Sequence, residues 1–298
     1  MKTRHLLTIL IVLIFALGGT QPSPVQAKQT VKFGFLAKRG KEKTIEQWSM
    51  MLDALQASTG LDFEIVPLAF TEIEPAIKSG RIDFLSTNPL IFVDQEQKYG
   101  VTPLVTKINI RMGKALSRFG GVIFVRADSP IRTIGDMRGK TFMCVKKSSF
   151  GGGQMAFRHL IENGLNPFTE TSLVEGRTHD NVVLAVQTGM VDVGTVRSDT
   201  LERMAEEGKI RLGDFRLIDR ADDDFPFMHT TRLYPEWVVL TLPHVSQQLQ
   251  AKVKAALLAL DKDNPALKKA KIAGWTEPLD YRPVAKTLII NLLNGLQQ

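Results

Sequence analysis

Short apolar segments alternate with amphipathic segments through most of this chain, and this alternation limits its possible folds more than any other feature. Residues 31–36 (VKFGFL) have the length and composition of a buried strand. In residues 44–58 the apolar side chains recur at the spacing of one helical face. Strands of four to six residues separated by helices predict βαβ units with a mostly parallel sheet.

The same alternation starts again at Gly121–Arg126 (GVIFVR), which indicates a second unit of the same kind. The tail of the chain has mostly helical periodicity. We therefore predict an α/β fold of two doubly wound lobes, joined by a hinge with two crossings near Ser117–Gly121 and Asp219–His229. The predicted boundaries are residues 28–118 for the first part of lobe 1, 119–219 for lobe 2, and 220–298 for the hinge return and the C-terminal part of lobe 1.

This layout has a consequence for function, because open α/β sheets bind ligands beyond the carboxyl ends of their strands. Two lobes joined by two crossings would place those strand ends face to face across a cleft. A hinge at the crossings can then close the cleft around a ligand. We therefore expect the ligand-binding residues just after the predicted strands.

The first 27 residues have the three-part layout of a secretory signal peptide. Lys2 and Arg4 precede an almost unbroken apolar run, Leu6–Leu17, and Val25-Gln26-Ala27 places small residues before a cleavage site. A membrane anchor is the alternative, but this run is shorter than the roughly 20 residues that a bilayer requires. We expect cleavage after Ala27 and a soluble exported protein.

The net charge of +7 is partly a property of this leader. The chain has 38 Lys and Arg against 31 Asp and Glu, and the leader contains two of the cations and no acidic residue, so the exported chain carries +5. Export and the absence of a basic run with interleaved aromatic residues argue against nucleic-acid binding. The single cysteine, Cys144, excludes an internal disulfide and a cysteine-based zinc site. No histidines show metal-ligand spacing, so we predict no metal and no cofactor.

An enzymatic function is a weaker alternative. Its best case is a Ser148 or Ser149 nucleophile with His179 or His229 as the base. The sequence lacks the G-x-S-x-G elbow, and nothing in it places a base beside either serine. We therefore predict no catalytic residue.

The segment Lys146–Gly153 (KKSSFGGG) is the most distinctive candidate for an anion site. It lies between a predicted strand and a predicted helix, where free backbone N–H groups and two hydroxyls would meet. Its glycines would let an oxyanion approach the backbone closely. An ordinary loop with an N-cap is the alternative, and the spacing of a P-loop is absent. The candidate ligand-binding residues of this segment are Ser148, Ser149, Phe150 and Gly151.

Two arginines follow other predicted strands. Arg39 comes after the first strand, within the basic segment Lys38-Arg39-Gly40-Lys41, and Arg197 comes after the strand at residues 191–196. A planar guanidinium suits the recognition of oxyanions. For the basic segment around Arg39, solvated surface charge is the alternative. We predict that both arginines reach the bound ligand.

Further polar residues lie near strand ends or near the second crossing. Thr87 and Asn88 follow the predicted strand at residues 82–85, although Asn88 would also cap the next helix. Asp180 opens another helix, where we favour N-capping over metal binding. The segment His229–Trp237 follows the second crossing, and we expect its tryptophan in the core. The candidates from these regions are Thr87, Asn88, Asp180, Thr231, Arg232 and Tyr234.

Several segments carry a family resemblance in their order and spacing. They are Gly34–Leu36, Arg81–Phe84, Asn88-Pro89, Gly121–Asp128, Asp136–Lys140, Ser148-Ser149 with the glycines that follow, and Asp180–Asp192. Together they resemble type II periplasmic solute-binding proteins, and more narrowly the phosphate, phosphite and phosphonate-binding (PhnD-like) family. The resemblance spans nearly all of residues 31–290. It implies a binding site between the lobes and delivery of the ligand to the permease of an ABC importer.

A second set of segments is most similar to the periplasmic sensor domains of tetrathionate-type histidine kinases. Such kinases carry a transmembrane helix and a kinase domain after the sensor domain, whereas this sequence ends at Gln298. We therefore expect a free protein, and the alternative function is a soluble sensor that presents tetrathionate or thiosulfate to a membrane kinase. The matching segments are Leu36–Glu42, Thr87–Pro89, Ser149–Gly152, His229–Trp237 and Gly274–Tyr281.

The sequence departs from the phosphonate-binding pattern, which implies acidic and aromatic side chains that cap a ligand amine. Arg39 and Asn88 stand after the first and third strands instead, and Phe150 interrupts the run of hydroxyl residues. We therefore expect a small oxyanion of phosphorus or sulfur rather than an aminophosphonate. We also expect a monomer that binds an ABC permease or a membrane sensor kinase.

Overall fold

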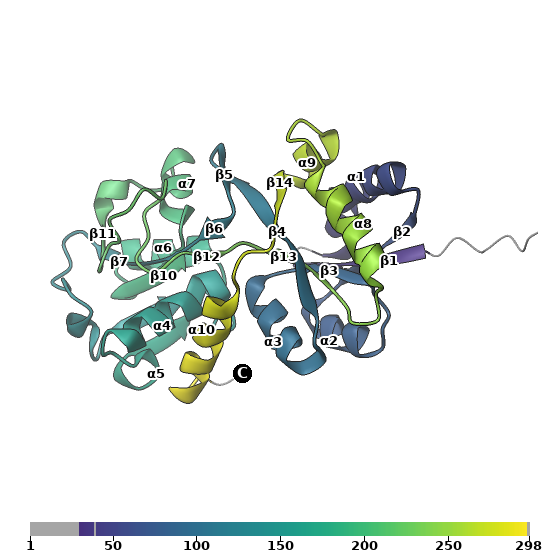
Figure 1. Cartoon of the computed structure of the whole chain (residues 1–298). Helices are drawn as coiled ribbons and strands as arrows, with labels where there is room; N and C mark the ends of the chain where they lie inside the picture. The colour runs from purple at the N-terminus through teal and green to yellow at the C-terminus, as the bar shows by residue number, and fades with distance from the viewer. Residues whose placement is uncertain (1–29, 39, 297–298) are drawn as a thin grey trace, which may run out of the picture.

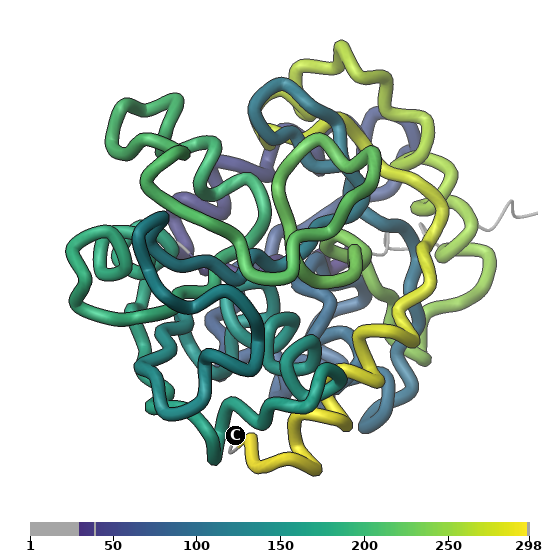
Figure 2. The backbone as a smooth tube through the Cα atoms, turned by 90° about the vertical axis from the view of Figure 1, so that its left-hand side faces the viewer, coloured from purple at the N-terminus to yellow at the C-terminus, as the bar shows by residue number. Residues whose placement is uncertain are grey.

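The computed structural model describes residues 30–38 and 40–296 and consists of two α/β lobes (Figure 1). The predicted signal peptide, residues 1–27, and the candidate ligand contact Arg39 lie outside the described residues. Each lobe is built around one mixed β-sheet. Figure 2 shows the molecule from the side of the second lobe.

Three parallel strands begin the sheet of the first lobe, as the sequence predicts. β1 (Thr30–Leu36) lies between β2 (Asp62–Leu68) and β3 (Phe84–Thr87). Their carboxyl ends therefore share one edge of the sheet. The helices that follow these strands are α1 (Lys41–Thr59), α2 (Phe70–Lys78) and α3 (Pro89–Tyr99).

The remaining pairings in this sheet are antiparallel, so the prediction of a mostly parallel sheet is wrong. β13 (Val238–Thr241) pairs antiparallel with β3 and with β4 (Thr102–Arg111), and β14 (Ile272–Thr276) pairs antiparallel with β4. The short β5 (Lys114–Leu116) extends β4 as a hairpin. The chain returns from the hinge to the first lobe at the carboxyl ends of the parallel strands. β13 therefore starts at that edge and runs antiparallel to β3.

The sheet of the second lobe has the same mixed character. β8 (Thr141–Cys144) lies parallel to and between β9 (Ser172–Glu175) and β10 (Val193–Arg197). β7 (Gly121–Arg126) pairs antiparallel with β10 and with β11 (Phe215–Leu217). A π-helical turn (Phe150–Gln154) leads into α4. The helices of this lobe are α4 (Met155–Glu162), α5 (Pro167–Glu170), α6 (His179–Gln187) and α7 (Thr200–Glu206).

Two short antiparallel strands, β6 (Arg118–Phe119) and β12 (Tyr234–Pro235), connect the lobes. The first crossing lies within the predicted segment, but the second lies later than the predicted Asp219–His229. The cause is hydrogen bonding of Thr230 to the second lobe: its amide N–H donates to the Gly121 carbonyl at 2.8 Å, and its Oγ1 donates to the Ile218 carbonyl at 3.0 Å. The chain therefore leaves this lobe only after residue 231.

The C-terminal helices take two different positions. α8 (Gln247–Leu258) and α9 (Pro265–Ala270) pack against α1 of the first lobe. α10 (Arg282–Leu293) lies between the lobes and contacts both α3 and α4 (Figure 1). Arg158 of α4, which is fully buried, donates to the carbonyl of Pro283 at 2.8 Å. The predicted assignment of this tail to the first lobe therefore omits its contacts with the second.

Apolar packing supports both lobes and the hinge between them. In the first lobe, the rings of Phe33, Phe35 and Trp48 stack in sequence, with centroids 4.8 and 5.1 Å apart. The same core cluster includes Phe119 of the hinge and Phe150 of the second lobe. Within the described ranges, no helix combines the length and apolarity needed to cross a membrane.

Candidate functional site

Charged side chains from both lobes meet beside the hinge, at the edge where strands of both sheets end. We call this group the interlobe cluster and define it by its members. The cluster consists of Lys38, Lys107, Arg111, Glu236 and Trp237 from the first lobe, and Arg197 and Asp199 from the second.

Arg197 forms two buried ion pairs, of which the pair with Glu236 connects the two lobes. Its Nη2 lies 2.6 Å from Glu236 Oε1, and its Nε lies 3.0 Å from Asp199 Oδ1. The side chain of Glu236 is completely buried and that of Arg197 nearly so. The guanidinium also lies over the ring of Phe119, 4.1 Å from its centroid. Breaking a buried pair leaves an uncompensated charge, so these contacts favour the relative placement of the lobes seen here.

The polar residues of β4 that belong to the cluster or contact it all lie on one face of the strand. Lys107, Asn109 and Arg111 alternate with isoleucines, and alternate side chains of a strand share a face. Asn109 Nδ2 donates to Glu236 Oε1 at 3.0 Å. Arg111 Nε lies 3.6 Å from Asp199 Oδ2. This face of β4 therefore points at the second lobe.

Trp237 brings two lysines together. Lys38 Nζ lies 4.6 Å and Lys107 Nζ lies 4.7 Å from the centroid of its ring. Cation–π contacts of this kind stabilise each ammonium by about 0.5–2 kcal/mol. The amide N–H of Lys107 donates to the Trp237 carbonyl at 2.8 Å, which fixes the strand against the ring. Two like charges on one ring favour an anion beside them.

The ionisation of Lys107 responds to this environment. Burial, together with the nearby cations Lys38, Arg111 and Arg197, lowers its pKa from 10.5 to about 7, although Glu236 opposes the change. A buried ammonium is costly because water no longer solvates it. Without an added anion, Lys107 is therefore about half protonated near neutral pH.

Glu236 shows the opposite balance. Its burial disfavours the carboxylate, but the charges of Arg197 and Lys107 and the hydrogen bonds from Arg197 and Asn109 hold its pKa at about 2. The carboxylate is therefore ionised at every physiological pH. Its two oxygens accept from Arg197, Asn109 and the amide N–H of Trp237, so they are already engaged.

The cluster contains four basic side chains and two carboxylates, and this composition suits an anionic ligand. No group of three His, Cys, Asp or Glu side chains arranged to hold a metal ion occurs in the described part of the chain. The cluster can therefore offer an anion positive charge, N–H donors and an aromatic face.

Comparison with known families decides the class of this protein. The model for periplasmic substrate-binding proteins of phosphonate ABC transporters matches residues 33–281, which include the whole interlobe cluster. The chain belongs to this family. As a periplasmic substrate-binding protein it has the type II architecture expected from its sequence, and the interlobe cluster includes Lys38 just after β1 and Arg197 at the end of β10.

The relatives of this substrate-binding protein include a sensor. A tetrathionate sensor histidine kinase of Salmonella typhimurium is 33% identical over 231 residues, which are 76% of this chain and 39% of the kinase. The substrate-binding protein thus spans less than half the length of that relative.

Solved structures share its fold. XAC2383 of Xanthomonas citri bound to ATP matches with a TM-score of 0.68 at 21% identity, over 89% of this chain and 96% of that one. PhnD1 of Prochlorococcus marinus in complex with methylphosphonate matches with a TM-score of 0.61 at 13% identity, over 89% and 99% of the two chains. Identities this low establish the two-lobed fold and nothing about the ligand.

The glycine-rich segment of the substrate-binding protein borders the cluster but serves mainly as packing. Ser149 Oγ accepts from the Gly152 amide N–H at 3.2 Å, which is the N-cap alternative named from the sequence. A Cβ on Gly151 would lie 2.8 Å from the ring of Phe119 and 3.5 Å from Arg197 Cβ. Phe150 is buried against Phe119 and Tyr234, with ring centroids 6.1 and 5.1 Å apart. Ser148 is exposed to solvent.

Thr87 and Asn88 lie at the carboxyl end of β3, as expected. Thr87 is completely buried, and its Oγ1 has no hydrogen-bond partner among the residues that the structure describes. Asn88 Oδ1 accepts from the Ile91 amide N–H at 2.9 Å and so caps α3. The structure therefore gives Asn88 a structural role and leaves the hydroxyl of Thr87 unexplained.

Four other candidates have contacts that hold the fold together, and the structure does not bring them into the cluster. Asp180 pairs with Arg203 and Lys209 on the surface of the second lobe. Thr231 Oγ1 accepts from the Gly121 amide N–H at 2.9 Å. Arg232 forms an ion pair with Glu162 at 3.1 Å. The hydroxyl of the buried Tyr234 accepts a hydrogen bond from Thr287 Oγ1 at 3.1 Å.

The sequence analysis missed most of the cluster. Lys107 and Arg111 stand in a segment, Lys107–Arg111 (KINIR), whose strict alternation of polar and apolar residues predicts a half-exposed strand. Trp237 was expected in the core, but it is only partly buried, and the ammonium groups of Lys38 and Lys107 lie over its ring. Glu236 gives no local signal, because its partners Arg197 and Asn109 are distant in the sequence.

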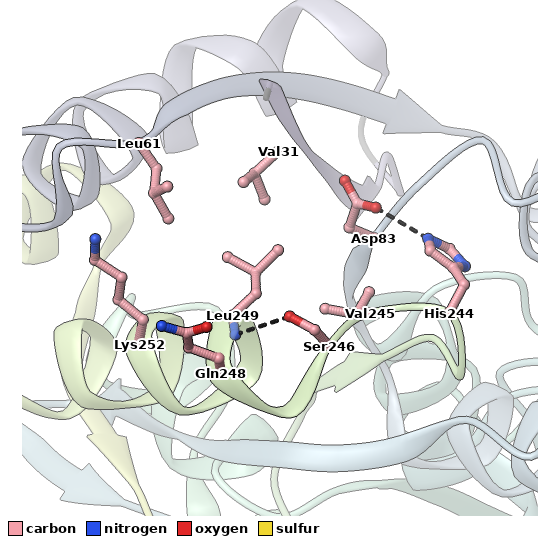
Figure 3. Close-up of a pocket in the computed structure, with 9 residues that line it drawn as sticks. All are labelled: Val31, Leu61, Asp83, His244, Val245, Ser246, Gln248, Leu249 and Lys252. Atoms are coloured by element: carbon pink, nitrogen blue, oxygen red, sulfur yellow. Dashed lines mark hydrogen bonds and ion pairs between the residues drawn. The ribbon is translucent and has the colours of Figure 1, made fainter. Parts of the chain in front are cut away.

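A separate cavity of about 450 Å³ lies in the first lobe (Figure 3). Its walls include Val31 at the start of β1, Leu249 of α8, and the ion pair between Asp83 and His244 at 3.0 Å. Val31 and Asp83 stand at the amino ends of β1 and β3, at the edge of the sheet opposite to Lys38 and Thr87. Lys252 lines the same cavity and is exposed.

Proposed function

We propose that this substrate-binding protein captures a small oxyanion of phosphorus or sulfur at the interlobe cluster and delivers it to an ABC importer. The observation that carries the proposal is the ammonium of Lys107. Lys107 is only 8% exposed, and its Nζ has no hydrogen-bond acceptor among residues 30–38 and 40–296. Lys38 Nζ and Lys107 Nζ lie over the ring of the same tryptophan, so an oxyanion beside that ring would accept a charge-assisted hydrogen bond from Lys107.

The same cluster disfavours ligands that carry an amine. An ammonium on the ligand would need a carboxylate, but Glu236 is engaged by Arg197 and Asn109, and Asp199 is engaged by Arg197 and lies near Arg111. The basic side chains would repel it as well. We therefore expect inorganic or simple alkyl oxyanions to bind more tightly than aminoalkyl phosphonates.

Closure of the lobes would follow from contacts that the anion makes with both of them. Lys107 and Trp237 belong to the first lobe, whereas Arg197 belongs to the second. A ligand shifts the balance toward the closed form only through such differential contacts. The closed surface is then what a permease would recognise.

A sensory role is the second candidate, and the 33% identity to a tetrathionate sensor histidine kinase favours it. In this case the closed protein would present tetrathionate or thiosulfate to a membrane kinase. Two assays on cells with and without the gene separate the roles. One measures uptake of labelled anion, and the other measures expression of a kinase-dependent reporter. Lost uptake supports the importer, and a lost reporter response with normal uptake supports the sensor.

We further propose that export removes residues 1–27 and that the mature protein acts in the periplasm as a monomer without catalytic activity. Mass spectrometry of protein recovered from the periplasm should begin at Lys28. Light scattering should give the mass of one chain. Turnover of a candidate anion or ester that is lost in Ser149→Ala would contradict the non-enzymatic proposal.

The test of anion binding uses thermal shift and calorimetry with sulfate, thiosulfate, tetrathionate, phosphite, phosphate and methylphosphonate. A specific ligand raises the melting temperature because it binds only the folded state. Lys107→Met should lower the affinity at least about tenfold. Lys252→Met, which removes an equal charge at the remote cavity, should bind like the wild type (Figure 3). Equal affinity in Lys107→Met and the wild type would contradict the proposed site.

A further inference from the structure

The position of Lys107 limits how its charge can be balanced. It stands in the middle of β4, with β13 and β14 as neighbouring strands, and its register partner on β14 is Trp275. Its Nζ lies 4.7 Å from the centroid of the Trp237 ring and reaches no acceptor within the described ranges. The backbone of Lys107 therefore lies between two strands, and its ammonium lies over an aromatic ring without a hydrogen bond to the described residues.

The charged groups around Lys107 do not neutralise it. Glu236 is the carboxylate that acts on it, but Arg197, Asn109 and the Trp237 amide N–H already occupy its oxygens. Lys38 after β1, Arg111 on the same strand and Arg197 on β10 are all positive and repel the ammonium. On the β14 side, Trp275 does not titrate.

We propose that Lys107 takes up one proton from solvent when the oxyanion binds, so that the anion and the proton enter the site together. This inference rests on the proposed function. The proton moves from water or buffer to Nζ, and the new ammonium donates a charge-assisted N–H···O bond to the anion. Without an anion the pKa of Lys107 is about 7, so its amine is mostly unprotonated above neutral pH.

Proton uptake has a direct consequence for binding. Because the protonated form holds the anion, affinity falls by about tenfold for each pH unit above pH 7 until the pKa of the occupied site is reached. Acid conditions favour capture and alkaline conditions favour release.

The experiment is titration calorimetry of the full mature protein with sulfate and thiosulfate at about pH 8.5, between the shifted and the ordinary pKa of Lys107. Both anions are fully ionised there, so any proton that moves belongs to the protein. Repeating the titration in buffers of different ionisation enthalpy counts the protons. The wild type should take up about one proton per anion.

Three variants assign the proton to its residue. Lys107→Arg keeps a permanent charge, so it should bind the anion without proton uptake and without the loss of affinity above pH 7. Lys107→Met should show no uptake and at least about tenfold weaker binding at pH 6.5. Lys252→Met should retain the uptake of the wild type.

The possible outcomes separate this inference from the proposed function. Anion binding by the wild type without proton uptake, or with uptake that persists in Lys107→Arg, overturns the inference and leaves the binding function standing. If the wild type binds neither probe nor any other anion of the panel, the proposed function fails and this inference fails with it. Should Lys107→Met fold poorly, Lys107→Arg still decides the question.

Discussion

Replacing Lys107 by methionine should make the empty protein more stable, although it weakens ligand binding. The burial that lowers the pKa of Lys107 from 10.5 to about 7 means that the folded state binds its proton less well than the unfolded chain. Each unit of pKa difference corresponds to about 1.4 kcal/mol. The full penalty is therefore on the order of 5 kcal/mol, and methionine has a similar shape without the charge.

The sign of this effect depends on pH in a defined way. Between pH 7 and 10.5 the unfolded chain binds more protons than the folded one, so the free energy of unfolding of the wild type rises with pH. The loss of folding stability caused by the charge of Lys107 is complete below pH 7 and disappears as the pH approaches 10.5. Lys107→Met should therefore gain a few kcal/mol at pH 6 and much less at pH 10.

Urea denaturation of the anion-free proteins at these two pH values measures the difference. The charge-matched control is Lys252→Met, which should differ from the wild type by less than about 0.5 kcal/mol at both. A Lys107→Met protein that is less stable than the wild type at pH 6 would refute the reasoning. A gain of stability that is independent of pH would also refute it, because it would not come from the proton.

Three further predictions concern the cluster and its surroundings. Glu236→Gln removes the carboxylate that pairs with Arg197 across the lobes and should lower the free energy of unfolding by about 3 kcal/mol in urea. A loss below about 1 kcal/mol would show that the pair contributes little. Gly151→Ala should lower the melting temperature because its Cβ would lie 2.8 Å from the Phe119 ring, whereas Gly213→Ala, with nothing within 4 Å, should not. The affinity for sulfate, measured by calorimetry from pH 6 to 9, should be constant below pH 7 and fall above it, and a flat profile would contradict a titrating lysine.

The parts of the fold that sequence analysis predicts correctly are those with local patterns. β1 and β3, with the helix that follows β1, match the periodicity of neighbouring residues, and the rule that ligand-binding residues follow strand ends identifies Arg197 at the end of β10. β13 and β14 were missed because their partners are far away in the sequence: Val238 pairs with both Thr87 and Thr106. The antiparallel half of the first sheet therefore needs tertiary information.

The glycine-rich segment illustrates why a candidate site is harder to predict than a fold. An N-cap and an anion cradle need the same residues, so Ser149 and the glycines fit both. The structure shows that Gly151 is needed beside Phe119, and the sequence contains no sign of that contact. Lys107 was not predicted as a site residue, because a single lysine in a strand does not indicate burial beside a tryptophan.

A crystal structure with the tightest-binding anion of the panel tests the central claim most directly. The account predicts one anion between the lobes, with an oxygen within hydrogen-bonding distance of Lys107 Nζ and beside the ring of Trp237. An anion bound in the cavity near Asp83 and His244, or at Ser149 with Lys107 untouched, would contradict it.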